Sequence, residues 1–255
     1  MMFFYVPFYY TVVSRLHSFS KSFSWVIIYL IPQFIFYFYF LDVVDYRQAF
    51  LYIALGVILI YTLYEIGYIY NDTETIKNEV QPTLRLDNFQ LSYYHEHKVL
   101  IYSIRALLAF IISLIFIHLE QYYFVLFVWC IIPIYAVYNS IRNRWNLPLH
   151  FCLVVIRYCS VTLLLGGGMV FFYCVLLFPL INLLERCSEK RFQLPFFQKN
   201  VFSNKVDGRY KYYCILIIIA GLLLFNEMNW TNLVFLFLSL YYFVYRWLIV
   251  KFKMV

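Results

Sequence analysis

Long apolar runs alternate with short polar segments along the whole chain, and this alternation is the strongest pattern in the sequence. A helix needs about 20 predominantly apolar residues to cross the hydrocarbon core of a bilayer. Eight runs approach or reach that length, so the pattern predicts an all-α polytopic membrane protein with eight transmembrane helices. The predicted spans cover residues 24–44, 49–70, 99–117, 122–138, 148–165, 168–184, 212–225 and 230–250.

Composition supports the same fold class. Of the 255 residues, 64% are hydrophobic and only 13% are charged, whereas a soluble domain carries about 25% charged residues. The apolar excess is too large for the core of a soluble protein of this length. We therefore expect the membrane lipid bilayer to surround most of the chain.

The basic residues orient the predicted spans. An even number of spans places both termini on one side, and 17 of the 20 Lys and Arg fall on that side. Arg47 alone lies on the other side, and Arg105 and Arg157 lie within spans. The positive-inside rule then predicts a multi-pass protein of the cell inner (cytoplasmic) membrane with both termini cytoplasmic. Since topology accounts for the net charge of +7, no nucleic acid partner is expected.

The polar segments subdivide what we predict to be a single domain over residues 1–255. Residues 1–23 are expected to form an interfacial segment that leads into the first span. Residues 71–98 and 185–211 are predicted to be two charged cytoplasmic loops, while the connections on the other side are short. Any chemistry is expected at the inner mouth, between these two loops.

One polar pattern occurs at the end of the second span and again at the end of the sixth. In each copy, three polar positions are separated by three and then four residues, so they share one face of a helix. The copies are Asp72, Thr75 and Glu79, and Asn182, Glu185 and Glu189. The repeat predicts two related four-helix halves around a central cavity, with the carboxylates facing one another across it.

Paired carboxylates at such a place suit a magnesium site. Mg²⁺ takes oxygen ligands and is usually held by one or two carboxylates together with substrate phosphate oxygens. Two acidic helix ends are therefore expected to hold Mg²⁺ and, through it, a diphosphate. The alternative is local: Asp72 or Asn71 caps a turn, and Glu185 and Glu189 pair with Lys190 or Arg191.

The residues of these segments resemble a known family. NDTETIKNE, residues 71–79, resembles the first aspartate-rich motif, N-D-x-x-D-x-x-x-D, of the UbiA family of intramembrane prenyltransferases, and ERCSE, residues 185–189, resembles its second motif, D-x-x-x-D. IYAVYNSIRNRWNLPLHF, residues 134–151, is similar to the Tyr-Ser-x-x-Lys-Arg stretch of that family. The family also places its two motifs on the cytoplasmic side, after the second and sixth helices.

The resemblance implies a set of catalytic residues that also bind the metal. Carried over position by position, they are Asp72, Glu79, Glu185 and Glu189. Glu replaces the family's Asp at three of these positions and keeps the charge. The middle Asp of the first motif falls on Thr75, which brings no charge to a metal. The implied cofactor is Mg²⁺.

Six further residues are predicted to bind the substrate: Asn71, Arg85, Arg105, Arg157, Lys190 and Arg191. Arg85 sits where the family usually has Arg-Pro. A charge within a span costs roughly 2.5–3.5 kcal/mol by insertion scales, so a charged residue there is expected to have a partner or a role. For Arg105 the options are a diphosphate, an ion pair with Glu65, or snorkelling towards the inner surface. Arg157 lies deeper, which favours a functional or paired role.

The resemblance implies Mg²⁺-dependent transfer of a prenyl or polyprenyl group from a polyprenyl diphosphate donor to a small-molecule or lipid acceptor. The acceptor is an aromatic ring or another group, and phosphoribosyl chemistry on a polyprenyl phosphate belongs to the same family. The first alternative is a catalytically degenerate protein that binds or transports a lipid diphosphate. A CDP-alcohol phosphotransferase ranks last, because "DGR" at residues 207–209 matches too little of that signature.

Overall fold

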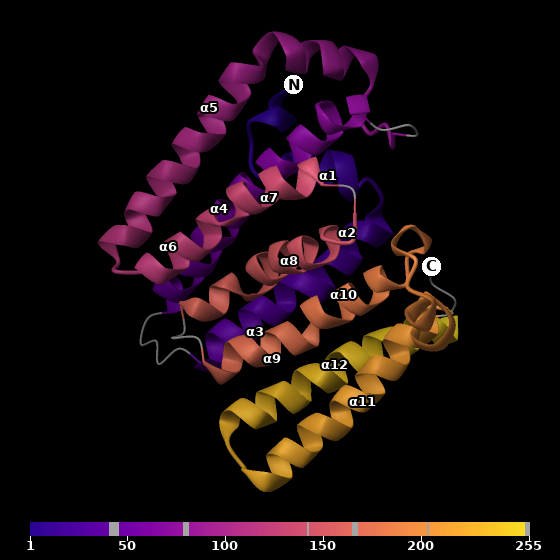
Figure 1. The fold of residues 1–255 in the computed structure, drawn as a ribbon. Helices are drawn as coiled ribbons and strands as arrows, with labels where there is room; N and C mark the ends of the chain where they lie inside the picture. The colour runs from indigo at the N-terminus through magenta and orange to yellow at the C-terminus, as the bar shows by residue number, and fades with distance from the viewer. Residues whose placement is uncertain (41–45, 79–81, 142, 165–167, 203, 253–255) are drawn as a thin grey trace. The chain divides into compact units, whose positions relative to one another are not determined.

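The computed structural model describes the chain except for residues 41–45, 79–81, 142, 165–167, 203 and 253–255. Over the described residues the chain is helical and contains no strand (Figure 1). In this part of the chain, eight helical segments are long and apolar enough to cross a membrane. They are Phe19–Phe36, Phe50–Lys77, Asn88–His118, Tyr122–Ser140, Asn146–Leu163, Met169–Cys187, Val206–Asn226 and Trp230–Phe252. The predicted all-α polytopic fold with eight spans is thus confirmed.

The chain divides into two compact units of four spans each. Unit 1 comprises Met1–Arg142 with Leu163–Leu165, and unit 2 comprises Asn143–Thr162 with Gly166–Val255. This division agrees with the two four-helix halves expected from the repeated polar pattern. That their carboxylates face one another across a central cavity stays a prediction.

Unit 1 contains ten helical segments among its described residues. They are η1 (Met2–Phe4), α1 (Tyr9–Arg15), α2 (Phe19–Trp25), the π-helical η2 (Val26–Leu30), α3 (Ile31–Phe40), α4 (Tyr46–Thr73), η3 (Thr75–Asn78), α5 (Asn88–His118), α6 (Tyr122–Trp129) and α7 (Ile131–Ser140). The long helix α4 packs against both α5 and α7.

Unit 2 contains a further seven segments in its described part. They are α8 (Asn146–Leu163), α9 (Met169–Leu177), α10 (Pro179–Cys187), η4 (Lys190–Phe192), the π-helical η5 (Phe197–Val201), α11 (Lys205–Asn226) and α12 (Trp230–Phe252). Helices α11 and α12 form a closely packed antiparallel hairpin, in which the rings of Tyr213 and Tyr242 stack at 5.2 Å.

Prolines interrupt two of the spans. Proline has no backbone N–H and its ring clashes with the carbonyl four residues earlier, so it tends to break a helix. Pro133 lies four residues after Trp129, where α6 ends and α7 begins shortly afterwards. Pro179 is the first residue of α10, and α9 ends just before it at Leu177. The fourth and sixth spans are therefore each built from two shorter helices.

Both predicted charged loops are shorter than the sequence pattern suggested. Helix α5 begins at Asn88, so residues 88–98 are helical rather than part of a loop. The physical reason is a capping box: Asp87 accepts from the backbone of Gln90, and the Gln90 side chain accepts from the backbone of Asp87. In unit 2, α10 continues to Cys187 and α11 begins at Lys205, where Asn204 caps the helix.

The N-terminal segment is packed into unit 1. The side chains of Phe4 and Tyr10 are fully buried, in a cluster that includes Ile69 of α4 and Ile101 of α5. The prediction of a simple interfacial segment over residues 1–23 took no account of this burial. The cause is tertiary, because polar groups of α4 and α5 bind the backbone of this segment.

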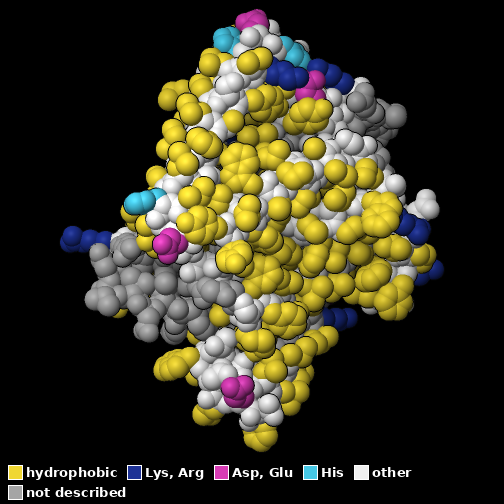
Figure 2. Space-filling model, turned by 60° about the vertical axis from the view of Figure 1, so that its left-hand side comes forward, with side chains coloured by type: hydrophobic (Ala, Val, Ile, Leu, Met, Phe, Trp, Pro, Cys, Tyr) yellow, Lys and Arg dark blue, Asp and Glu magenta, His cyan; other side chains and the backbone are white. Residues whose placement is uncertain are grey.

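From Val99 to Ile117, the outward face of α5 is predominantly apolar. Its exposed side chains include Leu107, Phe110 and Leu114, and Figure 2 shows hydrophobic side chains over most of the face turned towards the viewer. Exposed apolar patches of this extent are rare on soluble monomers. Such a surface suits contact with lipid. The buried Arg105 lies on the opposite face of the same helix, inside unit 1.

Candidate functional site

The carboxylate of Asp72 accepts several hydrogen bonds from side chains of unit 1. It lies in the last turn of α4 and is only 1% exposed. Its oxygens accept hydrogen bonds from Tyr10 Oη at 2.9 Å, from Arg15 at 2.7 and 3.0 Å, and from Arg85 at 2.9 Å. The neighbouring Asn71 donates a further bond at 3.2 Å. Two guanidinium groups on one carboxylate leave a local excess of positive charge.

Three elements of unit 1 bring these groups together. Arg15 is the last residue of α1, where a cation also interacts favourably with the helix dipole. Arg85 lies in the segment between η3 and α5. Sequence reasoning selected Asp72 and Arg85 but missed Arg15 and Tyr10. No local signal identifies them, because they are separated from Asp72 by 57 and 62 residues.

The groups from α1 are held in their donor forms. Burial, followed by the charge of Asp72 and the hydrogen bond to it, raises the pKa of Tyr10, so its hydroxyl keeps the proton that it donates. Burial opposes the charge on Arg15, but the hydrogen bond and the attraction to Asp72 outweigh it and raise its pKa. Arg15 therefore remains a cation.

Glu65 and Arg105 form an ion pair inside unit 1. Arg105 Nη1 lies 2.9 Å from Glu65 Oε2, and both side chains are 0% exposed. The remaining donors of Arg105 bind backbone carbonyls of the N-terminal segment, Phe4 at 2.6 Å and Phe3 and Val6 each at 3.4 Å. Of the three options for Arg105, the structure therefore shows pairing with Glu65.

Glu65 also stands in for a missing helix cap. Helix α1 begins after Phe8, whose side chain offers no cap and whose φ is 70°. Glu65 instead accepts the backbone N–H of Phe8 at 3.1 Å and that of Thr11 at 2.6 Å. The Thr11 hydroxyl donates at 2.6 Å as well. A carboxylate at the start of a helix satisfies otherwise unpaired N–H groups, so α1 depends on a side chain from α4.

The rest of the first motif is arranged differently from the prediction. Helix α4 ends at Thr73 and the 3₁₀ helix η3 starts at Thr75, so the assumption of one continuous α-helical face is wrong here. Glu79 lies outside the described residues. Glu74 belongs to a separate set of contacts, with Lys77 at 2.7 Å and Lys98 at 2.6 Å.

The second motif is also paired with arginines. Glu185, near the end of α10, accepts a hydrogen bond and forms an ion pair with Arg209 in the second turn of α11. Glu189 pairs with Arg191 at 2.7 Å, as the local alternative predicted. Lys190 lies in η4 and is exposed.

The two units thus share one arrangement. In unit 1, Asp72 at the end of the second span binds Arg85, and in unit 2, Glu185 at the end of the second span binds Arg209. In both cases the arginine comes from the region that leads into or begins the third span of the unit. The correspondence is one of place within the unit only, because in the repeated spacing Asp72 aligns with Asn182 and Glu185 aligns with Thr75.

Other predicted residues of unit 2 form a basic cluster. Asn182 is the first polar position of the second pattern, and its Oδ1 lies 3.0 Å from Nε2 of His150. Arg186 approaches the same nitrogen at 3.3 Å. Arg157 of α8 places its guanidinium 5.1 Å from the centre of the Tyr158 ring, a cation–π contact. Sequence reasoning did not select His150 or Arg186.

Comparisons with known proteins identify no relative. No family model matches the chain, and no curated protein and no solved structure matches it. Fold and contacts define a class, an all-α polytopic membrane protein. The resemblance to the UbiA family stays a prediction.

The donor set can be tested against Mg²⁺. Among the described residues, no group of three or more His, Cys, Asp and Glu is placed to hold a metal. Asp72, Glu185 and Glu189 nevertheless offer the oxygen ligands that Mg²⁺ takes, and it commonly needs only one or two carboxylates when phosphate oxygens complete its shell. The arginines bound to Asp72 and Glu185 are the groups that phosphates prefer. Within each unit, the carboxylate and its arginine are thus residue types that suit a metal bound together with phosphate oxygens.

Proposed function

We propose that the protein transfers a prenyl or polyprenyl group from a polyprenyl diphosphate to an acceptor within the membrane, with Mg²⁺ as cofactor. The observation that carries the proposal is the carboxylate–arginine pairing at the end of the second span of both units. A magnesium diphosphate presents a cation and an anion together, so a site for it needs both kinds of side chain. In the structure, the carboxylate and the arginine of each unit bind one another.

When the ligand binds, the carboxylates release the arginines and bind the metal, and the arginines bind the phosphate oxygens. Asp72, Glu79, Glu185 and Glu189 are the proposed metal ligands. Asn71, Arg85, Lys190 and Arg191 are proposed to bind phosphate oxygens, as are Arg105 and Arg157 if their present contacts are released. When bound, Mg²⁺ neutralises charge on the departing diphosphate. The bond between the prenyl carbon and oxygen breaks, and the diphosphate leaves with the electron pair. The acceptor forms the new bond to carbon with an electron pair of its own and then releases a proton.

The membrane surroundings support this chemistry. The apolar helices exclude water from the reacting carbon, which protects an allylic cation from hydrolysis. The acceptor is a small molecule or lipid, an aromatic ring or another group. Phosphoribosyl chemistry on a polyprenyl phosphate is the variant of this reaction that the resemblance also implies. The proposed location is the cell inner membrane with both termini cytoplasmic, as the distribution of basic residues favours.

A second candidate is a protein that binds or transports a lipid diphosphate without catalysis. Two observations favour it: Thr75 stands where the family has a metal-binding Asp, and Asp72 is engaged by two arginines. It differs from the first candidate in one measurable respect, because the donor would bind but would not be consumed.

The deciding experiment is turnover of a radiolabelled polyprenyl diphosphate by the purified protein, with a membrane extract as the source of acceptors. We expect diphosphate release with Mg²⁺, none with EDTA, and a loss of about a hundredfold in Asp72→Asn. Glu74→Gln is the matched control, since Glu74 is a paired carboxylate at the same helix end but outside the proposed site. Binding without release would select the second candidate, and metal-independent release equal in all three proteins would exclude both.

A further inference from the structure

Arg246 is a buried cation in a span of unit 2. It lies in α12, and the residue is only 8% exposed. No residue that the structure describes forms a hydrogen bond or an ion pair with it, and its guanidinium lies 5.2 Å from the centre of the Tyr245 ring. A charged side chain that snorkels to the membrane surface keeps its head in water. The low exposure of Arg246 argues against that explanation.

The hairpin of α11 and α12 brings Arg246 close to Arg209. The two helices pack side by side (Figure 1), and the rings of Tyr213 and Tyr242 stack between them. Arg209 lies one helical turn before Tyr213, on the same face of α11. Arg246 lies one turn after Tyr242, so the antiparallel arrangement places the two arginines opposite one another. The charge of Arg209 accordingly acts on Arg246.

One carboxylate serves these two cations. Arg209 binds Glu185 through Nε and Nη2, which leaves its Nη1 without a hydrogen bond to any described residue. The Arg209 side chain is 24% exposed and is therefore accessible from outside the unit. The charge of Glu185 also acts on Arg246, but no bond joins them. These three residues, named the hairpin cluster below, thus carry one positive charge in excess.

The other carboxylates of unit 2 do not supply the missing negative charge. Glu189 already forms an ion pair, and Asp207 accepts a hydrogen bond from Asn204 at 3.0 Å. Glu227 follows the last residue of α11, at the opposite end of the hairpin. A buried charge without a counter-charge is strongly unfavourable. The hairpin cluster therefore indicates an anion that unit 2 does not itself contain.

The charge and the location of the hairpin cluster favour one kind of anion. Guanidinium groups suit phosphate oxygens, and a phosphodiester carries one negative charge, equal to the excess of the cluster. Arg209 and Arg246 lie about 6 and about 9 Å from the neighbouring ends of their helices, hence near one membrane surface. Basic groups between spanning helices bind lipid head groups at such a place. Exposed apolar side chains of the same hairpin, such as Ile215 and Leu222, suit contact with acyl chains.

We propose that Arg209 and Arg246 bind a phosphodiester group, carried by an anionic membrane lipid, while Glu185 holds Arg209 in place. Arg246 has no part in the proposed prenyl transfer. Glu185 and Arg209 occur in both proposals, but lipid binding is measured without turnover, so either proposal can fail alone.

The test is direct binding to the purified full-length protein in an uncharged detergent, measured calorimetrically. The probes are dioctanoyl phosphatidylglycerol, a phosphodiester, and dioctanoylglycerol, which has the same acyl chains but no phosphate. We expect phosphatidylglycerol to bind about tenfold more tightly, as hydrogen bonds to a charged group allow. Dimethyl phosphate, a phosphodiester without acyl chains, is the competitor. Failure to displace the lipid supports a lipid ligand, and displacement at an equal concentration assigns the same site to a free phosphodiester.

Three variants locate the binding. Arg246→Gln removes the unpaired cation and should abolish the preference for phosphatidylglycerol. Arg246→Lys keeps the charge and should retain most of the preference. Lys251→Gln removes an exposed cation from the same helix and should bind like the wild type.

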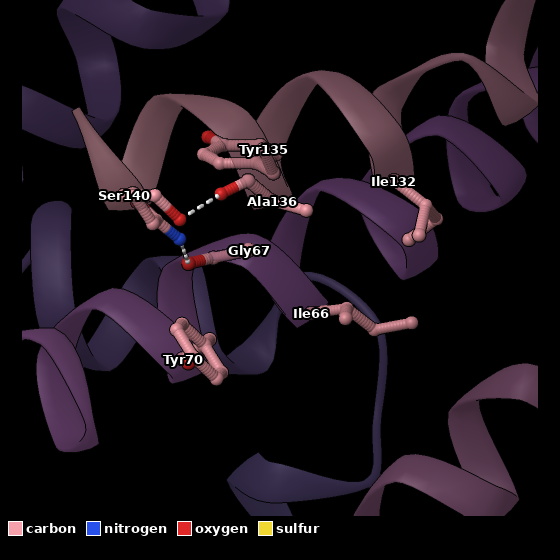
Figure 3. Close-up of a pocket in the computed structure, with 8 residues that line it drawn as sticks. Ile66, Gly67, Tyr70, Ile132, Tyr135, Ala136 and Ser140 are labelled. Carbon is pink, nitrogen blue, oxygen red and sulfur yellow. Dashed lines mark hydrogen bonds between the residues drawn. The ribbon is translucent and has the colours of Figure 1, made fainter.

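A pocket in unit 1 provides a further control. Helices α4 and α7 line a mainly apolar pocket of about 290 Å³, and its lining residues carry no charge (Figure 3). An acyl chain in this pocket would bind without a phosphate contact. Ala136→Phe narrows the pocket and should leave the preference for phosphatidylglycerol unchanged.

Equal affinity for phosphatidylglycerol and dioctanoylglycerol in the wild type would overturn the proposal, since it would show that no phosphate is recognised. Equal losses in Arg246→Gln and Lys251→Gln would overturn it as well, because binding would then follow the general surface charge. The first result comes from the wild type, so it decides the question even if Arg246→Gln fails to fold.

Discussion

Glu65 and Arg105 form a fully buried ion pair at 2.9 Å, and each partner also binds the N-terminal segment. Glu65 holds the N–H groups at the start of α1, while Arg105 holds carbonyls of the residues before it. One pair from two spanning helices therefore fixes a segment that precedes the first span. That segment in turn supplies Arg15 and Tyr10 to Asp72.

Breaking this pair should destabilise the protein strongly. Arg105→Leu leaves Glu65 as a buried charge without its partner, which typically costs about 3–5 kcal/mol. The double variant Glu65→Leu, Arg105→Leu removes both charges and should lose less than the sum of the two single variants. Denaturant unfolding in detergent measures all four proteins, and strict additivity would contradict the coupling.

The hydroxyl of Thr11 should contribute more than an ordinary buried hydroxyl. Thr11→Val keeps the shape but removes the hydrogen bond to Glu65, and bonds to charged groups contribute about 1.5–3 kcal/mol. Thr62→Val is the control, because the buried Thr62 hydroxyl only donates to a carbonyl of its own helix. Equal losses of unfolding free energy would mean that Glu65 does not depend on Thr11.

Mg²⁺ should bind with the diphosphate and only weakly without it. The Asp72 carboxylate already accepts from two arginines, and a diphosphate gives those arginines a new partner. Thermal unfolding should show little change with Mg²⁺ alone and a rise in Tm with Mg²⁺ and a polyprenyl diphosphate together. At a hundred times Kd the gain is about 2.7 kcal/mol. A large shift with Mg²⁺ alone would indicate a preformed metal site instead.

Turnover should depend on Arg209, the arginine that pairs with Glu185 in unit 2. Arg209→Gln removes the cation that binds Glu185, and we expect diphosphate release to fall about a hundredfold. Lys211→Gln is the control, because Lys211 is an exposed cation on the same helix. If both variants retain full turnover, the pairing in unit 2 is structural only.

Reporter fusions test the orientation of the spans. Fusions after Glu120 and after Met228 lie in the connections from α5 to α6 and from α11 to α12, and should report the non-cytoplasmic side. Fusions at the C-terminus should report the cytoplasm, because 17 of the 20 basic residues lie on that side of the predicted topology. A cytoplasmic signal from Glu120 would invert the topology and the proposed location.

The sequence by itself determined the eight spans and their division into two sets of four. Transfer of an apolar run into lipid depends on that run alone, so local composition suffices. The capping box of Asp87 and Gln90 is likewise a local feature, although the alternation of apolar and polar residues predicted a loop there.

Tertiary structure decided the partners of the polar side chains. The sequence allowed three options for Arg105, and packing of α4 against α5 selected Glu65, 40 residues away. The sequence also identified Asp72 as a candidate site residue, but it did not identify Arg15, which lies 57 residues away and binds Asp72. Side-chain hydrogen bonds require groups within about 3 Å, and only the packing of distant helices brings such groups together.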